Sequence, residues 1–99
     1  MVRRAALAHH SKRLRWHVYI LQASDQTLYT GIARDASKRL LAHNTKKGSR
    51  YLRGRAPYEI VYREIRFGRS SASKREAQIK NLTRGQKKEL IHGASLLAQ

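Results

Sequence analysis

The sequence predicts an α+β fold in which helices flank a three-stranded antiparallel sheet. Two adjacent stretches rich in aromatic and β-branched residues, joined by a turn, predict a hairpin, and a third such stretch follows a basic loop. Helix-start signals stand between these stretches and after them. The expected order is therefore β-β-α-β-α-α, and 99 residues, 40% of them hydrophobic, suffice for one small domain around one core.

The first two strands are predicted over residues 16–21 (WHVYIL) and 27–32 (TLYTGI), with turn-forming residues between them. If the hairpin pivots on Ser24, Tyr19 pairs with Tyr29, because the two are equidistant from the pivot. Directly opposed residues share a face of a sheet, so the two phenols then project side by side. The alternative is that both tyrosines are half-buried packing residues.

A short helix is predicted over residues 36–44, directly after the hairpin. Asp35 precedes it and can act as the N-cap, because its side chain can accept a hydrogen bond from the first turn. Leu40 and Leu41 are expected to face the sheet.

The third strand is predicted over residues 58–65 (YEIVYREI), after a proline whose missing N–H is tolerated at the entrance of a strand. A helix is predicted to start at Ser70 or Ser71 and to run to about Leu82.

A final helix is predicted from a capping box. Thr83 and Gln86 have the required spacing, and the helix is expected to continue to about Ile91. We expect three segments along the chain, namely a basic N-terminal arm over 1–15, a folded domain over 16–92 and a short C-terminal tail over 93–99.

Positive charge dominates the composition, with 22 Lys and Arg against 6 Asp and Glu and a formal charge of +16. This excess indicates a polyanionic partner, above all nucleic acid, and does not separate a nuclease from a passive binder. The absence of cysteine excludes a disulfide framework, a thiolate metal site and a cysteine nucleophile. It agrees with a cytoplasmic location, where association with the nucleoid is one option. No apolar run approaches the roughly 18 residues of a membrane span, so no membrane partner is expected.

Residues 45–56 (TKKGSRYLRGRA) form a predicted cationic loop with two glycines and no acid. An aromatic residue among basic side chains suits contact with a nucleic-acid backbone together with base stacking. The residues predicted to bind nucleic acid are Lys46, Lys47, Arg50, Tyr51, Arg53 and Arg55.

Arg39 and His43 are spaced i,i+4 and therefore lie on one stripe of the short helix. The pair suits a phosphodiester site, because a guanidinium stabilises charge on the phosphate and an imidazole can shuttle a proton. The alternative is that Arg39 is a solvated arginine on a basic protein.

Glu76 is the only acid between Arg66 and Lys88, a stretch that holds eight Lys and Arg residues. It lies close to the apolar stripe of its helix, where a carboxylate can hold a hard divalent cation such as Mg²⁺. One carboxylate cannot build a two-metal site, so a metal mechanism here uses a single ion. The alternative is a surface pair with Lys80 at i+4.

Together these pieces resemble the GIY-YIG nuclease superfamily, and in particular its small stand-alone bacterial members. The two half-motifs match Val18-Tyr19-Ile20 and Tyr29-Thr30-Gly31. The helix arginine of the family matches Arg39, which is followed by His43, and its late glutamate matches Glu76. The resemblance covers most of the chain, and the order and spacing of the motifs agree with a GIY-YIG-like sheet and helices.

The resemblance implies a metal-dependent DNA endonuclease that uses a single Mg²⁺ or Mn²⁺ ion, in DNA repair, recombination or processing. In the family, the residue matching Glu76 ligates the metal and the residue matching Arg39 steadies the phosphate. Tyr19 matches the usual general-base candidate, Tyr29 a residue that supports the nucleophile or the phosphate, and His43 a place where Tyr or His is common. A free tyrosine has a pKa near 10, so the base role requires a cationic site to lower it or His43 to share the proton.

The sequence departs from the family pattern at several places. His17 stands where the first half-motif has a glycine, and Ile32 follows Gly31 where many members carry a lysine. The late asparagine of the family has no clear counterpart, and its role is not transferred to Asn81. The alternative function is a non-catalytic basic protein that binds DNA or RNA and retains the fold, and a nucleoid-packaging protein is a third hypothesis. The co-occurrence of the five candidate catalytic residues favours the nuclease.

Overall fold

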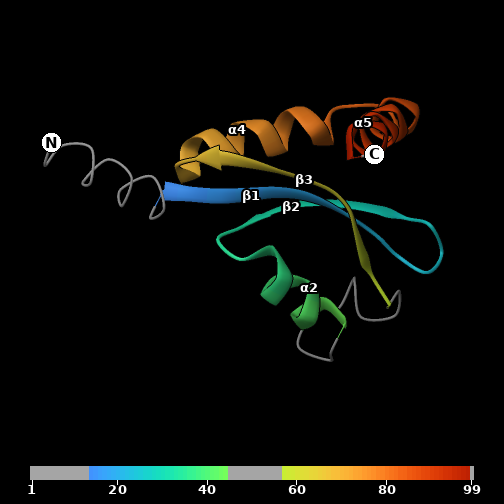
Figure 1. The fold of residues 1–99 in the computed structure, drawn as a ribbon, viewed down its shortest axis with the longest axis horizontal. Helices are drawn as coiled ribbons and strands as arrows, with labels where there is room; N and C mark the ends of the chain where they lie inside the picture. Colours follow the sequence, from blue (N-terminus) through green and yellow to red (C-terminus); the bar gives the residue numbers. More distant parts are fainter. Residues whose placement is uncertain (1–13, 45–56, 99) are drawn as a thin grey trace, which may run out of the picture.

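A three-stranded antiparallel sheet separates one helix from two others (Figure 1). The computed structural model describes residues 14–44 and 57–98. The strand order is β2-β1-β3, with α2 below the sheet and α4 and α5 above it in Figure 1. The predicted α+β class and order of elements are confirmed. The elements are β1 (Arg15–Gln22), β2 (Leu28–Ala33), α2 (Ala36–Asn44), β3 (Glu59–Phe67), α4 (Arg69–Lys80) and α5 (Arg84–Ala98).

The central strand β1 is buried on both faces. Its four middle residues, Val18, Tyr19, Ile20 and Leu21, are at most 2% exposed. Tyr19 and Leu21 pack in the core on the α2 side, whereas Val18 and Ile20 pack against α4 and α5. Because helices cover both faces, apolar residues are needed at successive positions, which explains the unbroken apolar run in this strand.

The pairing of the hairpin differs from the prediction. Tyr19 lies opposite Gly31 and Tyr29 lies opposite Leu21, so the predicted Tyr19–Tyr29 pair is wrong. The observed register is shifted by two residues, and side chains alternate with a period of two along a strand. Both tyrosines therefore still lie on one face of the sheet, as predicted.

The turn of the hairpin explains the shift. The backbone N–H of Gln26 donates to the carbonyl oxygen of Ala23 at 2.9 Å, and Gln26 has a left-handed φ of 68°. The backbone N–H of Ala23 in turn donates to Thr27. This is a β-turn followed by a left-handed residue, a common three-residue hairpin loop, and it centres the hairpin on Asp25 rather than on Ser24.

The N-cap of α2 is confirmed, because Oδ1 of Asp35 accepts a hydrogen bond from the backbone N–H of Lys38 at 3.0 Å. Leu40 packs in the core between α2 and the sheet. Leu41 is 66% exposed, so the prediction that both leucines face the sheet is wrong for Leu41. Ala36 and Leu40 lie one turn apart on the buried face, and Leu41 is rotated away from them.

Helix α4 begins at Arg69, one residue before the earliest predicted start, and ends at Lys80 rather than at about Leu82. Gly68 causes the early start, because its φ of 91° reverses the chain directly after β3. A left-handed backbone of this kind favours glycine. The cap therefore depends on the backbone of Gly68 and not on a hydroxyl of Ser70.

Helix α5 begins with the predicted capping box. The backbone N–H of Thr83 donates to Oε1 of Gln86 at 2.9 Å, and the backbone N–H of Gln86 donates to Oγ1 of Thr83 at 3.1 Å. The helix runs to Ala98, so the predicted end at about Ile91 is wrong. The sequence after Ile91 contains alanine and leucine, which favour helix, and no proline to stop it.

Glu64 links β3 to α4 through charged hydrogen bonds. Its Oε1 accepts from Nε of Arg75 at 2.7 Å and from the hydroxyl of Tyr62 at 3.0 Å, and its Oε2 accepts from Nε of Arg66 at 2.8 Å. Burial acts to raise the pKa of Glu64, but these hydrogen bonds outweigh it and hold the pKa below its ordinary value. The carboxylate is thus charged and fully engaged in holding two elements together.

Replacement of this carboxylate tests the link. We expect Glu64→Gln to lower the free energy of unfolding at neutral pH by about 1–2 kcal/mol, with only a small share from the exposed Arg66. Because the folded pKa lies below the reference value of 4.5, this stabilisation is present above pH 4.5 and is lost as the pH falls through the folded pKa. Urea unfolding of the wild-type protein and of Glu64→Gln, at neutral pH and well below pH 4.5, measures this stabilisation. An equal difference in stability at both pH values contradicts the assignment.

Asn44 holds the end of α2 against the entrance of β3. Its Nδ2 donates to the carbonyl oxygen of Tyr58 at 3.0 Å, and its Oδ1 accepts from the backbone N–H of Tyr58 at 2.5 Å. The predicted cationic loop, residues 45–56, connects these two residues and lies outside the described residues.

Candidate active site

A cleft opens at the outer edge of the sheet, along β2. Because β2 is an edge strand, α2 reaches the cleft from one face of the sheet and α4 reaches it from the other. The volume of about 420 Å³ lies within the range of small-molecule sites. Four of the five predicted catalytic residues line it: Tyr19, Tyr29, Arg39 and Glu76.

The two tyrosines enter the cleft from neighbouring strands. Tyr19 lies on β1 and is 2% exposed, whereas Tyr29 on β2 is half-buried. The ring of Tyr19 lies over Gly31, because a Cβ atom built on Gly31 would meet the Tyr19 hydroxyl at 2.7 Å and its Cζ at 2.9 Å. The second half-motif therefore has two roles. Tyr29 supplies one phenol, and Gly31, which has no side chain, leaves room for the phenol of Tyr19.

The phenol of Tyr19 is protonated at neutral pH. Burial raises its pKa above the ordinary value of 10.0, and Tyr29 adds to the effect. The Arg39 guanidinium acts in the opposite direction, through its charge and a hydrogen bond to the phenol, but does not outweigh burial. A role of Tyr19 as general base requires a lowered pKa, and Arg39 alone does not lower the pKa of Tyr19 below its ordinary value.

Glu76 points into the same cleft from α4. Its side chain is 23% exposed, and its Oε2 lies 3.4 Å from Nζ of Lys80, which is 53% exposed. The two alternatives for Glu76 therefore coexist, since the carboxylate both lines the cleft and forms the i,i+4 pair. In the described part of the chain, no group of three or more His, Asp or Glu residues could hold a metal ion. A single carboxylate beside phenolic oxygens fits Mg²⁺ or Mn²⁺, hard ions that keep several waters and take further oxygen ligands from a phosphate.

Two predicted groups lie outside the described side chains. His43 belongs to α2, one turn after Arg39, but its side chain is not among those described. The six predicted nucleic-acid-binding residues all belong to 45–56 and also lie outside the described residues. Their roles stay predictions.

Three aromatic or basic residues that the sequence did not single out also line the cleft, namely Trp16, Arg34 and Arg69. The guanidinium carbons of Arg34 and Arg69 lie 5.7 Å and 5.8 Å from the centre of the Trp16 ring. Trp16 lies near the start of β1, Arg34 follows β2 and Arg69 begins α4, so no local spacing connects them. The only signal that could have found them is that each is an aromatic or basic residue at or near the end of an element.

His17, which replaces the motif glycine, is a partly buried imidazole on the face of the sheet that also carries Tyr19. Its Nδ1 is buried and has no hydrogen-bond partner among the described residues. Burial, followed by the charges of Arg63 and Arg15, lowers the pKa of His17, so the ring is neutral at neutral pH. It does not line the cleft.

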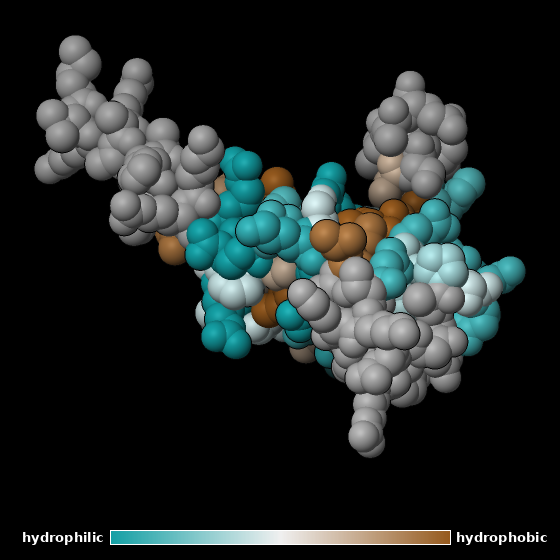
Figure 2. Space-filling model, turned by 90° about the horizontal axis from the view of Figure 1, so that it is seen from below, coloured by the Kyte–Doolittle hydropathy of each residue, from teal (hydrophilic) through white to brown (hydrophobic). Residues whose placement is uncertain are grey.

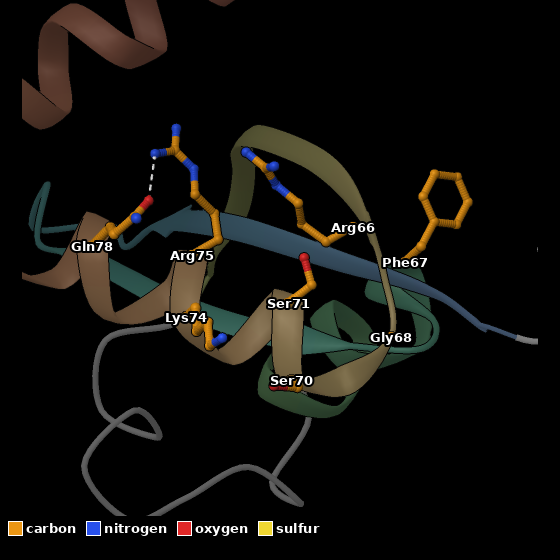
Figure 3. Close-up of a pocket in the computed structure, with 8 residues that line it drawn as sticks. All are labelled: Arg66, Phe67, Gly68, Ser70, Ser71, Lys74, Arg75 and Gln78. Carbon is orange, nitrogen blue, oxygen red and sulfur yellow. Dashed lines mark hydrogen bonds between the residues drawn. The ribbon is translucent and has the colours of Figure 1, made fainter.

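A second cleft lies on the other side of α4, where the helix meets the end of β3 (Figure 3). Arg66, Lys74 and Arg75 line it, and Nη1 of Arg75 donates to Gln78 at 3.2 Å. Glu64 binds Arg66 and Arg75, which offsets part of their charge, and no carboxylate lines this cleft. The combination of a carboxylate, phenols and a guanidinium is found in the β2 cleft instead.

Hydrophilic residues cover most of the described surface on the side of α2 (Figure 2). Within residues 14–44 and 57–98, no helix is both long and apolar enough to cross a membrane. With a charge of +16, such a surface suits a polyanion.

Comparison with known families matches the GIY-YIG catalytic domain to residues 15–89. The chain belongs to the GIY-YIG family. The match includes both half-motifs, Arg39 and Glu76, and it confirms the resemblance predicted from these residues. Family membership places the chain in a nuclease superfamily and implies a nucleic-acid substrate.

Curated relatives match about three quarters or more of the chain. The chain is 49% identical over 77 residues to a UPF0213 protein of Desulfotalea psychrophila, covering 77% of this chain and 70% of the relative. It is 45% identical over 80 residues to a UPF0213 protein of Clostridium perfringens, covering 81% and 86%. Among solved structures, the UPF0213 protein of Bacillus halodurans matches with a TM-score of 0.52 and 33% identity, covering 79% of this chain and 83% of that one. A protein of E. faecalis matches with a TM-score of 0.58 and 33% identity, covering 83% and 88%.

Proposed function

We propose that this GIY-YIG protein is a DNA endonuclease of the cytoplasm that hydrolyses phosphodiester bonds with a single divalent cation, in DNA repair, recombination or processing. The observation that carries the proposal is the half-buried carboxylate of Glu76 in a cleft that also holds Arg39 and two phenols. The proposed catalytic residues are Tyr19, Tyr29, Arg39, His43 and Glu76.

Glu76 is the proposed metal ligand, with Mg²⁺ or Mn²⁺ as the ion. A divalent ion held there supplies positive charge that stabilises the phosphate in the transition state and lowers the pKa of water and hydroxyl groups beside it. This requirement explains why a carboxylate stands in a helix otherwise rich in Lys and Arg.

The other side chains bind and orient the phosphate. Arg39 extends from α2 into the cleft, where its guanidinium can donate two parallel hydrogen bonds to phosphate oxygens. Tyr29 and the protonated Tyr19 are hydrogen-bond donors at the same place, and such preorganised donors stabilise developing negative charge. His43 would accept the proton that the attacking water loses, or Tyr19 would do so if a bound cation lowered its pKa.

A purely passive nucleic-acid binder is the competing function. The charge of +16 serves either function equally. Glu76 distinguishes them, because a carboxylate repels phosphate and weakens a site whose only task is to bind it. The six residues of the cationic loop are proposed to hold the DNA backbone in both cases.

Incubation with branched, nicked, single-stranded and linear duplex DNA, with Mg²⁺ or Mn²⁺ and with EDTA as control, tests the proposal. We expect cleavage of at least one substrate, and none with EDTA. Tight, salt-dependent binding of every substrate without any cleavage contradicts the nuclease and supports the passive binder.

A further inference from the structure

Trp16 gathers two arginines at one end of the β2 cleft. Trp16 lies near the start of β1, Arg34 directly follows β2, and Arg69 is the first residue of α4. Their guanidinium carbons lie 5.7 Å and 5.8 Å from the centre of the indole ring, within the range of cation–π contact. All three residues line the cleft that contains Glu76.

No described carboxylate forms an ion pair with either arginine. The ion pairs among the described residues involve Arg66, Arg75 and Lys80, and neither Arg34 nor Arg69 takes part in one. Two guanidinium groups beside one ring repel each other, and an anion placed between them removes that repulsion. Both side chains are exposed along part of their length, so a ligand can reach them.

The indole ring also reduces the cost of binding. A free arginine side chain loses much conformational freedom when it is fixed on a ligand, whereas a guanidinium already held against an aromatic ring loses less. Because Trp16 itself packs against the core between the sheet and α4, its position is fixed. The two arginines are therefore oriented before any ligand arrives.

We propose that Arg34 and Arg69, held by Trp16, bind the backbone phosphate adjacent to the one that is cleaved. This assignment rests on the proposed function, which places the cleaved phosphate at Arg39 and Glu76. A nucleic-acid strand carries phosphates at regular intervals, so a strand with one phosphate there presents the next one along the same cleft. Phosphate is favoured over a base, because guanidinium groups already occupy the ring that a base would stack on.

Fluorescence anisotropy of a short labelled DNA duplex in EDTA, without cleavage, tests the subsite. We expect Arg34→Ala and Arg69→Ala each to weaken binding several-fold more than Lys88→Ala, which removes an exposed charge on α5. Each arginine variant is expected to reduce the slope of log affinity against log salt by about 1. Arginine variants that match Lys88→Ala in both affinity and slope overturn the proposal.

Variants of Trp16 test whether the indole ring contributes to binding beyond the charges of the two arginines. Trp16→Leu removes no charge, yet it is expected to weaken binding, whereas Trp16→Phe keeps an aromatic face and most of the affinity. If Trp16→Leu does not fold, the binding of Trp16→Phe and of the two arginine variants tests the proposal instead. If a folded Trp16→Leu protein binds DNA as tightly as the wild-type protein, the proposed role of the ring is wrong. If the wild-type protein cleaves no DNA while the arginine effects persist, the subsite stands and the nuclease function fails.

Discussion

Glu76→Gln is expected to reduce the single-turnover rate of DNA cleavage by at least about a thousandfold, while DNA binding is retained. The amide keeps the size and helix position of the side chain but removes the negative charge that is proposed to hold a hard cation. Loss of a metal that stabilises transition-state charge by several kcal/mol corresponds to a factor of this size. Binding in EDTA should be equal or tighter, because one charge repelling the phosphates is gone.

Lys80→Ala is the matched control for this variant. Lys80 is the ion-pair partner of Glu76, at 3.4 Å, and is 53% exposed, so the pair contributes only a few tenths of a kcal/mol to stability. We expect Lys80→Ala to retain cleavage within a few-fold of the wild-type rate. If instead Lys80→Ala and Glu76→Gln lose cleavage equally, the carboxylate acts only as the partner of Lys80.

Gly31→Ala is expected to damage both the fold and the site. The added methyl group would lie 2.7 Å from the hydroxyl and 2.9 Å from Cζ of Tyr19, and the buried ring has little room to move. Overpacking of this kind costs about 1–3 kcal/mol of unfolding free energy. Because Tyr19 is proposed to contact the reacting phosphate, its displacement is expected to lower the cleavage rate by about a hundredfold.

Gly93→Ala makes the same substitution where a Cβ atom meets nothing within 4 Å. Gly93 lies within α5, so alanine should leave cleavage unchanged and stabilise the helix by up to about 1 kcal/mol. Thermal unfolding and single-turnover cleavage of both variants make the comparison. A Gly31→Ala protein with wild-type melting temperature and rate contradicts the packing of Tyr19 over Gly31.

Local signals in the sequence were sufficient for much of the fold. The N-cap by Asp35 and the capping box of Thr83 and Gln86 each depend on residues three positions apart. The hydrogen bonds of both are present in the structure. The register of the hairpin depends on the left-handed backbone of Gln26, which no residue preference indicates. The prediction of a shared face for Tyr19 and Tyr29 survived only because the shift was an even number of residues.

Contacts between distant elements account for what the sequence did not indicate. Glu64 was placed only in a strand, and its bonds to Arg75 and Arg66 depend on how α4 crosses β3. Likewise, Arg34 and Arg69 meet at Trp16 only because the end of β2 and the start of α4 lie close to the start of β1. Motif residues could be predicted because the family fixes their spacing, whereas these partners have no motif.

The central claim is that the lone carboxylate of the β2 cleft holds the divalent ion. At 11.4 kDa the protein suits NMR, and paramagnetic Mn²⁺ broadens the signals of nuclei near its binding site. Titration of ¹⁵N-labelled protein with Mn²⁺ is predicted to broaden first the amide signals of Glu76, Tyr29 and their neighbours in the cleft, and Glu76→Gln is predicted to abolish this pattern. Broadening centred elsewhere, or unchanged in Glu76→Gln, contradicts the claim.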